Sequence, residues 1–460
     1  MGSVGELSVP GLHGVCRPAK PFHLRSAHRI PTNARHSAAT DLRAAAPGLC
    51  LVRSGKLISM DAGSRLLQNA VPFFLLLILA ELYVDRRHGT GRYRRFAMWS
   101  DLAVGSVSQV CDLLFKAACL PVYALVYEHA RLFDLERTPW LHWTVALVGV
   151  DFLYYFWHRA GHEVRVLWAI HAVHHQSEDL NLGVALRQPA FQAPTVVLFF
   201  LPLACLGVTP TLLTLAYACN LIYQFFVHTQ AVRSLGPLEW VLNTPSHHRV
   251  HHGCDSEYLD KNYGGILIIW DRCFGTFAAE RAAPRYGVTT PLASFNPLWA
   301  NVIELELLVR QTRQVASARE LFRLWLGHPA TTLPKTPEST ARPSTKYDVG
   351  PGRPAPYAVW QALMLFLVLN TLFLFVAHAE PRSLLAAAWA GLAVFWSALA
   401  LLGLVEHKAW LRSSEYARVS FIVLGAAVSG WLLSGPVAGL AALLAALALV
   451  ALPLRWLPRT

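Results

Sequence analysis

Long apolar runs constrain this chain of 460 residues more than any other feature of its sequence. One α-helix crosses the hydrocarbon core of a bilayer with about 20 consecutive apolar residues. Backbone polar groups must be paired within the membrane, which favours helices. The runs therefore predict an all-α, polytopic membrane helical bundle. They are Ala70–Val84, Leu102–Tyr127, Leu141–Trp157, Tyr357–Val376, Leu384–Val405, Val419–Leu433 and Val437–Leu454.

The composition agrees with this interpretation. Hydrophobic residues make up 54% of the chain and charged residues 15%, whereas an average soluble domain is about 25% charged. A soluble fold of this size could not bury so much apolar surface, and a disordered chain would be poor in apolar residues. The composition therefore excludes an ordinary soluble enzyme and a disordered protein.

A further apolar stretch, Phe191–Val227, is too long for one membrane span and short for two complete ones. Pro202, Gly207 and Pro210 interrupt it, and residues of these types bend or end helices. We expect a tight helical hairpin here, which dips into or crosses the bilayer.

The distribution of positive charge predicts the orientation of the spans, because Lys and Arg are concentrated in cytoplasmic loops. The loop Asp85–Phe96 carries five arginines and is expected to be cytoplasmic. Alternation along the chain places the later basic loops on the same side, where they account for the net charge of +12. The charge therefore indicates membrane topology, and we expect no nucleic-acid partner.

Four segments are expected along the chain. Residues 1–59 are basic and poor in acid, so they are expected to be a disordered extension such as a transit peptide, or to precede a true start at Met60; we favour the second interpretation. Residues 60–300 are predicted to form a membrane-embedded catalytic domain. Residues 301–356 are predicted to be a cytoplasmic segment with a linker that holds seven prolines in His328–Pro356. Residues 357–460 are predicted to form a C-terminal region of four membrane helices.

Histidines gather in three tight clusters between the predicted spans. The first cluster has the spacing i, i+4, and the second and third share the spacing i, i+3, i+4. Residues three and four apart lie on one face of a helix, so each cluster is expected to point its imidazoles at one spot. The clusters are His158 and His162, then His171, His174 and His175, then His248, His251 and His252.

Eight imidazoles at one predicted membrane edge indicate metal binding. A single histidine on an apolar helix is usually a satisfied core residue, but eight buried imidazoles without a metal would be costly polar groups. Neutral imidazole is a favoured ligand of iron, zinc and copper. Eight ligands exceed what one ion with open positions uses, so two ions fit better. We therefore predict a di-metal site at the cytoplasmic edge.

Two further histidines need separate interpretations. His228 ends the predicted hairpin and would emerge at the same edge, so it is a candidate ninth ligand or an ordinary polar residue at a helix end. His247 is adjacent to His248 and faces another direction on a helix. We therefore do not expect His247 to be a ligand.

Two acids are candidate catalytic residues. Asp151 lies seven residues before His158, two helical turns along the same face, and could orient a ligand ring or be an ordinary helix-end charge. Glu163 follows His162 directly and could support the ligands or act as a proton donor or acceptor.

Ligation by histidine alone narrows the expected reaction. Soluble di-iron oxygenases hold their metals with several Glu ligands in a helix bundle. Neutral imidazoles leave two divalent ions electrophilic, which suits activation of O2 beside a lipid tail. The apolar hairpin and the neighbouring spans would supply a dry slot for an acyl or alkyl chain.

Several stretches around these residues resemble the fatty acid hydroxylase/sterol desaturase superfamily of membrane di-metal oxygenases, and within it the alkylglycerol monooxygenase branch. The likeness runs from about Ala70 to Val288, and the first 59 residues depart from it. The stretches that carry it are Asp151–Arg159, His174–Asn181, Ala185–Gln188, Leu221–Phe225, Gly236–Glu239, Asn243–Gly253, Asp260–Gly265 and Ile269–Phe277.

The resemblance implies two iron ions ligated by the clustered histidines, with Glu163 also involved in activity. It further implies that O2 hydroxylates the carbon next to an ether oxygen of an alkylglycerol. The hemiacetal then collapses to a fatty aldehyde and a glycerol derivative, and tetrahydrobiopterin supplies the electrons. The implied partners are the lipid substrate, O2, the bilayer, and a reductant or pterin-recycling system.

Two alternatives remain at this point. One is a hydroxylase or desaturase of a fatty acyl, sterol or carotenoid substrate. The other is a metal transporter or sensor, although transport favours polar residues along several spans and not at one edge. In each case the protein would lie in the endoplasmic reticulum of a eukaryote or the inner membrane of a bacterium, with its active site on the cytoplasmic side.

Overall fold

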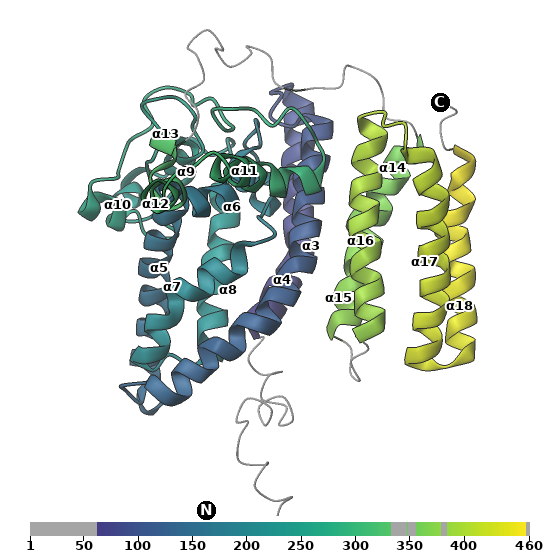
Figure 1. The fold of residues 1–460 in the computed structure, drawn as a ribbon, viewed down its shortest axis with the longest axis horizontal. Coiled ribbons are helices and arrows are strands. Elements are labelled where there is room, and N and C mark those ends of the chain that lie inside the picture. Colours follow the sequence, from purple (N-terminus) through teal and green to yellow (C-terminus); the bar gives the residue numbers. More distant parts are fainter. Residues whose placement is uncertain (1–61, 333–346, 348–355, 379–383, 457–460) are drawn as a thin grey trace, which may run out of the picture. The chain divides into compact units, whose positions relative to one another are not determined.

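The computed structural model describes residues 62–332, 347, 356–378 and 384–456 (Figure 1). Residues 1–59 and nearly all of the predicted Pro-rich linker lie outside these ranges. Within them the chain forms no β-strand, only two isolated bridges, Leu242 with Leu267 and Gly253 with Tyr286. The prediction of an all-α fold is confirmed.

The helices form two groups along the chain. The first group is α3 (Ala62–His88), α4 (Arg95–Ala130), α5 (Pro139–Glu163), α6 (Arg165–His175), α7 (Gln192–Leu206), α8 (Pro210–Val227), α9 (Pro245–His251), α10 (Ile269–Phe274), α11 (Pro297–Thr312), α12 (Ala318–Leu326) and α13 (Pro329–Thr332). The second is α14 (Pro356–Leu363), the π-helical η5 (Met364–Leu369), α15 (Asn370–His378), α16 (Leu384–Val405), α17 (Leu411–Ser434) and α18 (Pro436–Ala446), which continues in η6 (Leu447–Ala451).

The described helices include six segments that are long and apolar enough to cross a membrane, so the protein is a multi-pass membrane protein. Two more predicted spans, within α5 and α17, form helices that carry more polar residues. The cytoplasmic orientation stays a prediction from the loop charges. The six segments are Ala62–His88, Arg95–Ala130, Pro210–Val227, Pro356–Leu374, Leu385–Val405 and Pro436–Arg455.

The interrupted stretch forms the predicted helical hairpin of α7 and α8. Gly207 ends α7 with a φ of +94°, a left-handed conformation that favours glycine. A Cβ atom at Gly207 would lie 2.2 Å from the carbonyl oxygen of Phe133, so no other residue fits there. Thr209 then caps α8 by accepting a hydrogen bond from the Leu212 amide, and Pro210 occupies the first turn.

Helix α17 begins at Leu411, eight residues before the predicted run at Val419. Two charges of this first part of the helix, Glu415 and Arg418, are buried and form an ion pair at 2.8 Å, so they do not require the segment to lie outside the membrane. The Tyr357 hydroxyl donates a hydrogen bond to the same carboxylate. Paired charges that face a helical bundle are tolerated where single charges are not.

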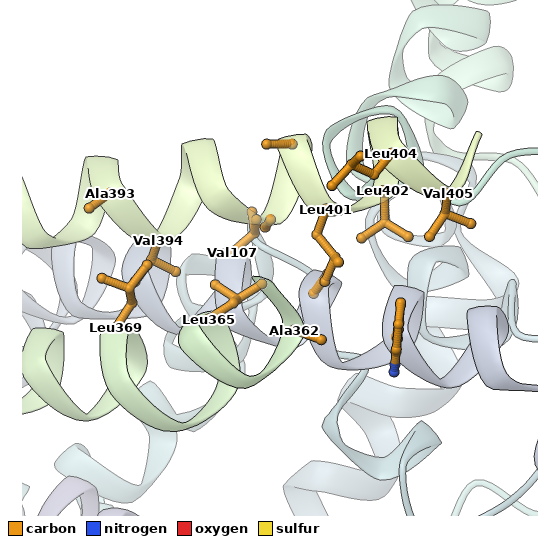
Figure 2. Close-up of a cluster of buried hydrophobic side chains, with 14 of the residues drawn as sticks. Val107, Ala362, Leu365, Leu369, Ala393, Val394, Leu401, Leu402, Leu404 and Val405 are labelled. Carbon is orange, nitrogen blue, oxygen red and sulfur yellow. The ribbon is translucent and has the colours of Figure 1, made fainter. Parts of the chain in front are cut away.

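The C-terminal helices pack directly on α4 through an apolar core (Figure 2). Leu365 of η5 and Val394 of α16 are fully buried there together with Val107 of α4. Because lipid is as apolar as these side chains, close van der Waals packing in this cluster, and not removal from water, holds the two groups of helices together. The predicted C-terminal region therefore shares its core with the first group of helices.

Helices α6 and α9–α12 gather across the end of α5 and α8 (Figure 1). Helix α11 belongs to this cap, because the Asn301 side chain accepts a hydrogen bond from the Ala190 amide at 2.8 Å. The Gln176 amide group also donates to the Ala300 carbonyl at 3.0 Å. The predicted domain boundary at residue 300 therefore falls inside a helix that supports the histidine-bearing segments.

Candidate metal centre

Four segments of the chain bring the nine candidate histidines together. Helix α5 ends with the first cluster, and α6 carries the second directly after the break at Val164. His228 follows the last residue of α8, and the short helix α9 carries the third cluster up to its C-cap His252. All nine side chains are buried, among them both helix-end residues His228 and His252.

The ring nitrogens form two compact groups, in each of which the candidate ligand atoms lie within 4.8 Å of one another. His228 belongs to one of them, whereas His247 belongs to neither. The five-histidine group contains His158, His162, His171, His175 and His251. The four-histidine group contains His174, His228, His248 and His252.

The second and third clusters are each divided between the two groups. His171 and His175 contribute to the five-histidine group, whereas His174 between them contributes to the other. The expectation that each cluster points at one spot was wrong for these two clusters. Residues i and i+4 lie about 40° apart around a helix, but i+3 and i+4 lie about 100° apart. One helix can therefore supply ligands to two neighbouring sites.

The distances between ring nitrogens match those of ligands around a common ion. Two imidazoles at right angles, each bonded at about 2.1 Å, place their nitrogens about 3.0 Å apart. In the five-histidine group the Nε2–Nε2 distances are 3.1 Å for His158–His171 and 3.2 Å for His171–His175. In the other group they are 3.1 Å for His174–His228, 2.9 Å for His228–His248 and 3.1 Å for His248–His252.

Backbone carbonyls hold several rings with Nε2 free for an ion. An Nδ1–H that donates to a carbonyl leaves the Nε2 lone pair available, which is the usual arrangement of a metal-ligating histidine. The Nε2 atoms of His162 and His251 are buried and, among the described residues, have no hydrogen-bond partner. The donor set therefore fits a metal. The Nδ1 contacts are His158 to Tyr263 O at 2.8 Å, His174 to Arg187 O at 2.9 Å, His228 to Gln224 O at 2.6 Å and His251 to Lys261 O at 3.0 Å.

Burial keeps these imidazoles in the neutral form that binds metal. It lowers the pKa of His174 in α6 to about 4. Burial also lowers the pKa values of His175 and His252 well below the ordinary 6.5, and the neighbouring imidazoles lower them further. Neutral rings can gather this closely without mutual repulsion.

The structure places Asp151 away from the ligand rings. Its carboxylate accepts hydrogen bonds from the amides of Ile266 at 2.6 Å and Leu267 at 3.2 Å, and from the side chains of Trp270 and Asn220, both at 2.9 Å. Seven residues of helix separate it from His158 by about 10 Å, too far for a carboxylate to reach. The suggestion that Asp151 orients a ligand ring directly was wrong.

Asp151 instead fixes the loop that holds the His158 ring through the Tyr263 carbonyl. The loop approaches so closely that a Cβ atom at Gly265 would lie 2.9 Å from the Asp151 carboxylate. Asp151 is therefore a positioning residue for the five-histidine group.

Asp260 and Tyr263 belong to the site although no spacing pattern indicated them. Asp260 Oδ1 lies 3.9 Å from Nδ1 of His162, on the side of the ring away from the unpartnered Nε2. The Tyr263 ring centroid lies 5.3 Å from that of His162, and its buried hydroxyl has no hydrogen-bond partner among the described residues. The one local signal was that both residues lie in Asp260–Gly265, a stretch that carried the resemblance.

Glu163 lies at the edge of the site and pairs with Arg159, whose Nε donates to its carboxylate at 2.9 Å. Both side chains are about one-third exposed, at 32% and 33%. The carboxylate is therefore accessible for proton exchange with water, and its role as a proton donor or acceptor remains a proposal.

Glu163→Gln is expected to lower turnover by at least tenfold while leaving the metal content unchanged. A general acid or base contributes about 100-fold or more, whereas a half-exposed ion pair contributes at most about 1 kcal/mol to stability. Turnover, metal content and thermal unfolding of the two proteins in detergent would be compared. If turnover did not change, Glu163 would have no role in proton transfer and would only form its ion pair with Arg159.

A cavity of about 510 Å³ begins at the histidines. His171, His174 and His228 line one end of it, next to Tyr154 and Trp157. Its walls come from α3, α4 and α8 and from the C-terminal segment η5–α15, with apolar residues predominating. A largely apolar cavity is therefore present where a slot was expected, and it is formed by more helices than the hairpin and its neighbours.

The histidine-bearing segment and the residues around it are similar to known proteins. Residues 143–276, which contain all nine histidines, match the Fatty acid hydroxylase family. The chain is 45% identical over 233 residues to an alkylglycerol monooxygenase of Homo sapiens, covering 50% of this chain and 52% of that one. It is 37% identical over 308 residues to the alkylglycerol monooxygenase of Danio rerio, covering 66% of this chain and 69% of the relative. This chain belongs to the alkylglycerol monooxygenase family.

The chain matches some relatives over only part of their length. The chain spans about half the length of the relatives from Homo sapiens and Xenopus tropicalis, 52% in each case. A more distant relative is an ornithine lipid hydroxylase of Rhizobium tropici, 32% identical over 137 residues, which covers 29% of this chain and 40% of that one. No solved structure matches the chain.

Proposed function

We propose that this protein is an integral-membrane monooxygenase that holds two iron ions with its nine clustered histidines and oxidises ether lipids. The observation that carries the proposal is the pair of histidine groups, five and four residues, at one end of a largely apolar cavity. The relatives named alkylglycerol monooxygenase support an alkylglycerol as the substrate.

The proposed reaction inserts one oxygen atom of O2 into a C–H bond next to the ether oxygen. The other oxygen atom leaves as water, with two electrons and two protons supplied by a reduced pterin such as tetrahydrobiopterin. The resulting hemiacetal then breaks its C–O bond to give a fatty aldehyde and the free glycerol hydroxyl. Iron held by neutral imidazoles supplies the redox chemistry of the oxygen insertion.

The residues of the chain position the substrate and exclude water. His171, His174 and His228 belong both to the histidine groups and to the cavity wall, so a carbon at this end of the cavity lies beside them. The apolar walls keep bulk water from the reacting carbon, which protects the oxidation from side reactions. The carbonyls that hold the rings keep them in place before the substrate binds.

Two measurements on the purified full-length protein test the proposal. We expect two iron atoms per chain by elemental analysis. We also expect a fatty aldehyde, detected by mass spectrometry, from a 1-O-alkylglycerol with tetrahydrobiopterin and O2, and little product without the pterin. A plain-acyl lipid in a parallel reaction provides the comparison.

The alternatives give different results in the same assays. Hydroxylated or desaturated acyl product in place of aldehyde would favour the acyl, sterol or carotenoid reaction. The Rhizobium tropici relative, whose name states a lipid hydroxylase, motivates this comparison. One exchangeable zinc ion and no oxidised product would favour the metal transporter or sensor.

A further inference from the structure

The cavity extends from the histidines along several turns of α3, α4 and α8. On α4 the lining residues run from Leu102 to Lys116, and on α8 they run from His228 back to Tyr217. At 1.5 Å per residue these pairs lie about 21 Å and 17 Å apart along their helices. The cavity is therefore elongated, with the histidines at one end.

The C-terminal helices form one of its long walls. Phe366, Phe373 and Leu374 of the segment η5–α15 line the cavity together with residues of α3 and α4. The Asn370 amide group fastens this wall to α4 by donating a hydrogen bond to the Ser106 hydroxyl at 3.0 Å. A chain in the cavity would thus contact apolar side chains along most of its length.

The end of the cavity away from the histidines is polar. Lys116 forms an ion pair with Asp112 one helical turn earlier, with Nζ 2.6 Å from Oδ2. Lys116 Nζ also donates to the Ser64 hydroxyl of α3 at 3.1 Å. All three residues line the cavity, and the Lys116 and Asp112 side chains are 25% and 40% exposed.

This polar end limits the length of an apolar chain. A methyl group pushed against the ion pair would remove water from both charges and offer no hydrogen bond in return, which is unfavourable. A shorter chain would leave part of the apolar wall without van der Waals contacts, which is also unfavourable. Binding should therefore be strongest for a chain that ends just before the pair.

The preferred length follows from the dimensions of the cavity. Carbon–carbon bonds of about 1.5 Å at tetrahedral angles advance an extended chain by about 1.25 Å per carbon. A cavity of about 17–21 Å along its helices then holds about 14–17 carbons.

We propose that the Asp112–Lys116 ion pair is the end stop of the substrate cavity and sets the longest alkyl chain that this protein accepts. The inference rests on the proposed function for the nature of the chain, a single alkyl group of an ether lipid. The position of the stop rests on the cavity alone.

The test measures binding as well as turnover. Full-length protein in lipid nanodiscs is titrated with 1-O-alkylglycerols of 14, 16, 18, 20 and 22 carbons, and the aldehyde is measured in parallel. In Asp112→Leu/Lys116→Leu we expect the ratio of affinities for the 20- and 16-carbon chains to rise at least tenfold. The iron content should not change, because the pair lies far from the histidines.

Two further variants show whether a changed length preference in the double variant could come from misfolding. Ser64→Leu keeps the ion pair and adds bulk at the same end, so it is expected to shift the preference about two carbons shorter. The matched control is Glu306→Leu/Arg310→Leu, which removes an ion pair of the same i, i+4 spacing on the exposed face of α11. It is expected to leave the length preference unchanged.

The outcomes separate this inference from the proposed function. An unchanged length preference in both end variants would overturn the end stop. So would an equal loss of affinity for all chain lengths in the double variant, because the pair would then hold a head group. A length optimum in binding without any aldehyde would overturn the proposed reaction and leave the end stop standing.

Discussion

His251→Ala is expected to lose iron and all measurable turnover, while the protein remains in the membrane. The His251 ring packs against three other rings of the five-histidine group, with centroids 4.4 Å from His158, 4.8 Å from His162 and 4.7 Å from His175. Its Nε2 is one of the two buried Nε2 atoms of that group that have no hydrogen-bond partner among the described residues. Since loss of a residue that merely supports a ligand costs about 10–100-fold, loss of a ligand should cost more than about 100-fold.

His174→Ala should have the same effect through the other group. Its Nε2 lies 3.1 Å from that of His228, and its Nδ1 is held by the Arg187 carbonyl. The remaining three histidines of that group would then face a gap in the ligand set. Loss of iron in both variants would show that each group contributes to metal binding.

His247→Gln is the matched control for both variants. His247 is buried at 3% exposure and lies directly before His248, but its ring packs on Phe277 and belongs to neither group. A change there disturbs the same short helix without removing a candidate ligand. We expect its iron content and turnover to stay within about twofold of the unmodified protein, as for a substitution away from the metal ligands.

Iron per chain, aldehyde formation and the amount of protein in the membrane fraction are the three measurements. Full activity in His174→Ala and His251→Ala would rule out the proposed centre. An equal loss of iron in His247→Gln would mean that α9 simply unfolds, and the histidine variants would then carry no information about ligation.

The sequence predicted the helical architecture well because its signals are local. Apolar runs near bilayer length must form helices, and the Gly207 turn of the hairpin is encoded by a residue suited to its conformation. The start of α17 was missed because its two buried charges are satisfied partly by Tyr357, 58 residues away from Glu415. A partner so distant in sequence leaves no trace in a hydropathy pattern.

In the candidate site too, features encoded by local sequence were predictable, and features that depend on distant partners were not. The histidine clusters were predictable, because residue type and helical spacing are both visible in the sequence. Their division into two groups depends on how α6 and α9 are turned relative to each other, which spacing within one helix does not determine. Asp260 and Tyr263 reach the site on a loop, and the course of that loop depends on a carboxylate more than 100 residues earlier.

The second large expected effect is that of replacing Asp151, the residue that carries this carboxylate. Asp151→Ala is expected to destabilise the protein by about 3–5 kcal/mol, because it leaves four buried or partly buried donors without an acceptor, at about 1–3 kcal/mol for each fully buried one. The donors are the amides of Ile266 and Leu267, the indole of Trp270 and the amide group of Asn220. Thermal unfolding in detergent would measure the loss.

The same change should release iron. Once the loop loosens, the Tyr263 carbonyl no longer holds Nδ1 of His158, and the ring loses its orientation toward the five-histidine group. Asp134→Ala removes a carboxylate from an exposed ion pair with Arg137 and is expected to cost at most about 1 kcal/mol, with iron retained. It serves as the control for loss of one negative charge.

The variants also distinguish a positioning role from a chemical one. If Asp151 acts only by holding the loop, iron content and turnover should fall together as the loop loosens. Asp151→Asn keeps one acceptor oxygen but presents an NH₂ group to other donors, so it should give an intermediate loss of both. Normal unfolding and full iron with turnover abolished would instead assign Asp151 to the chemistry, and the loop would need another anchor.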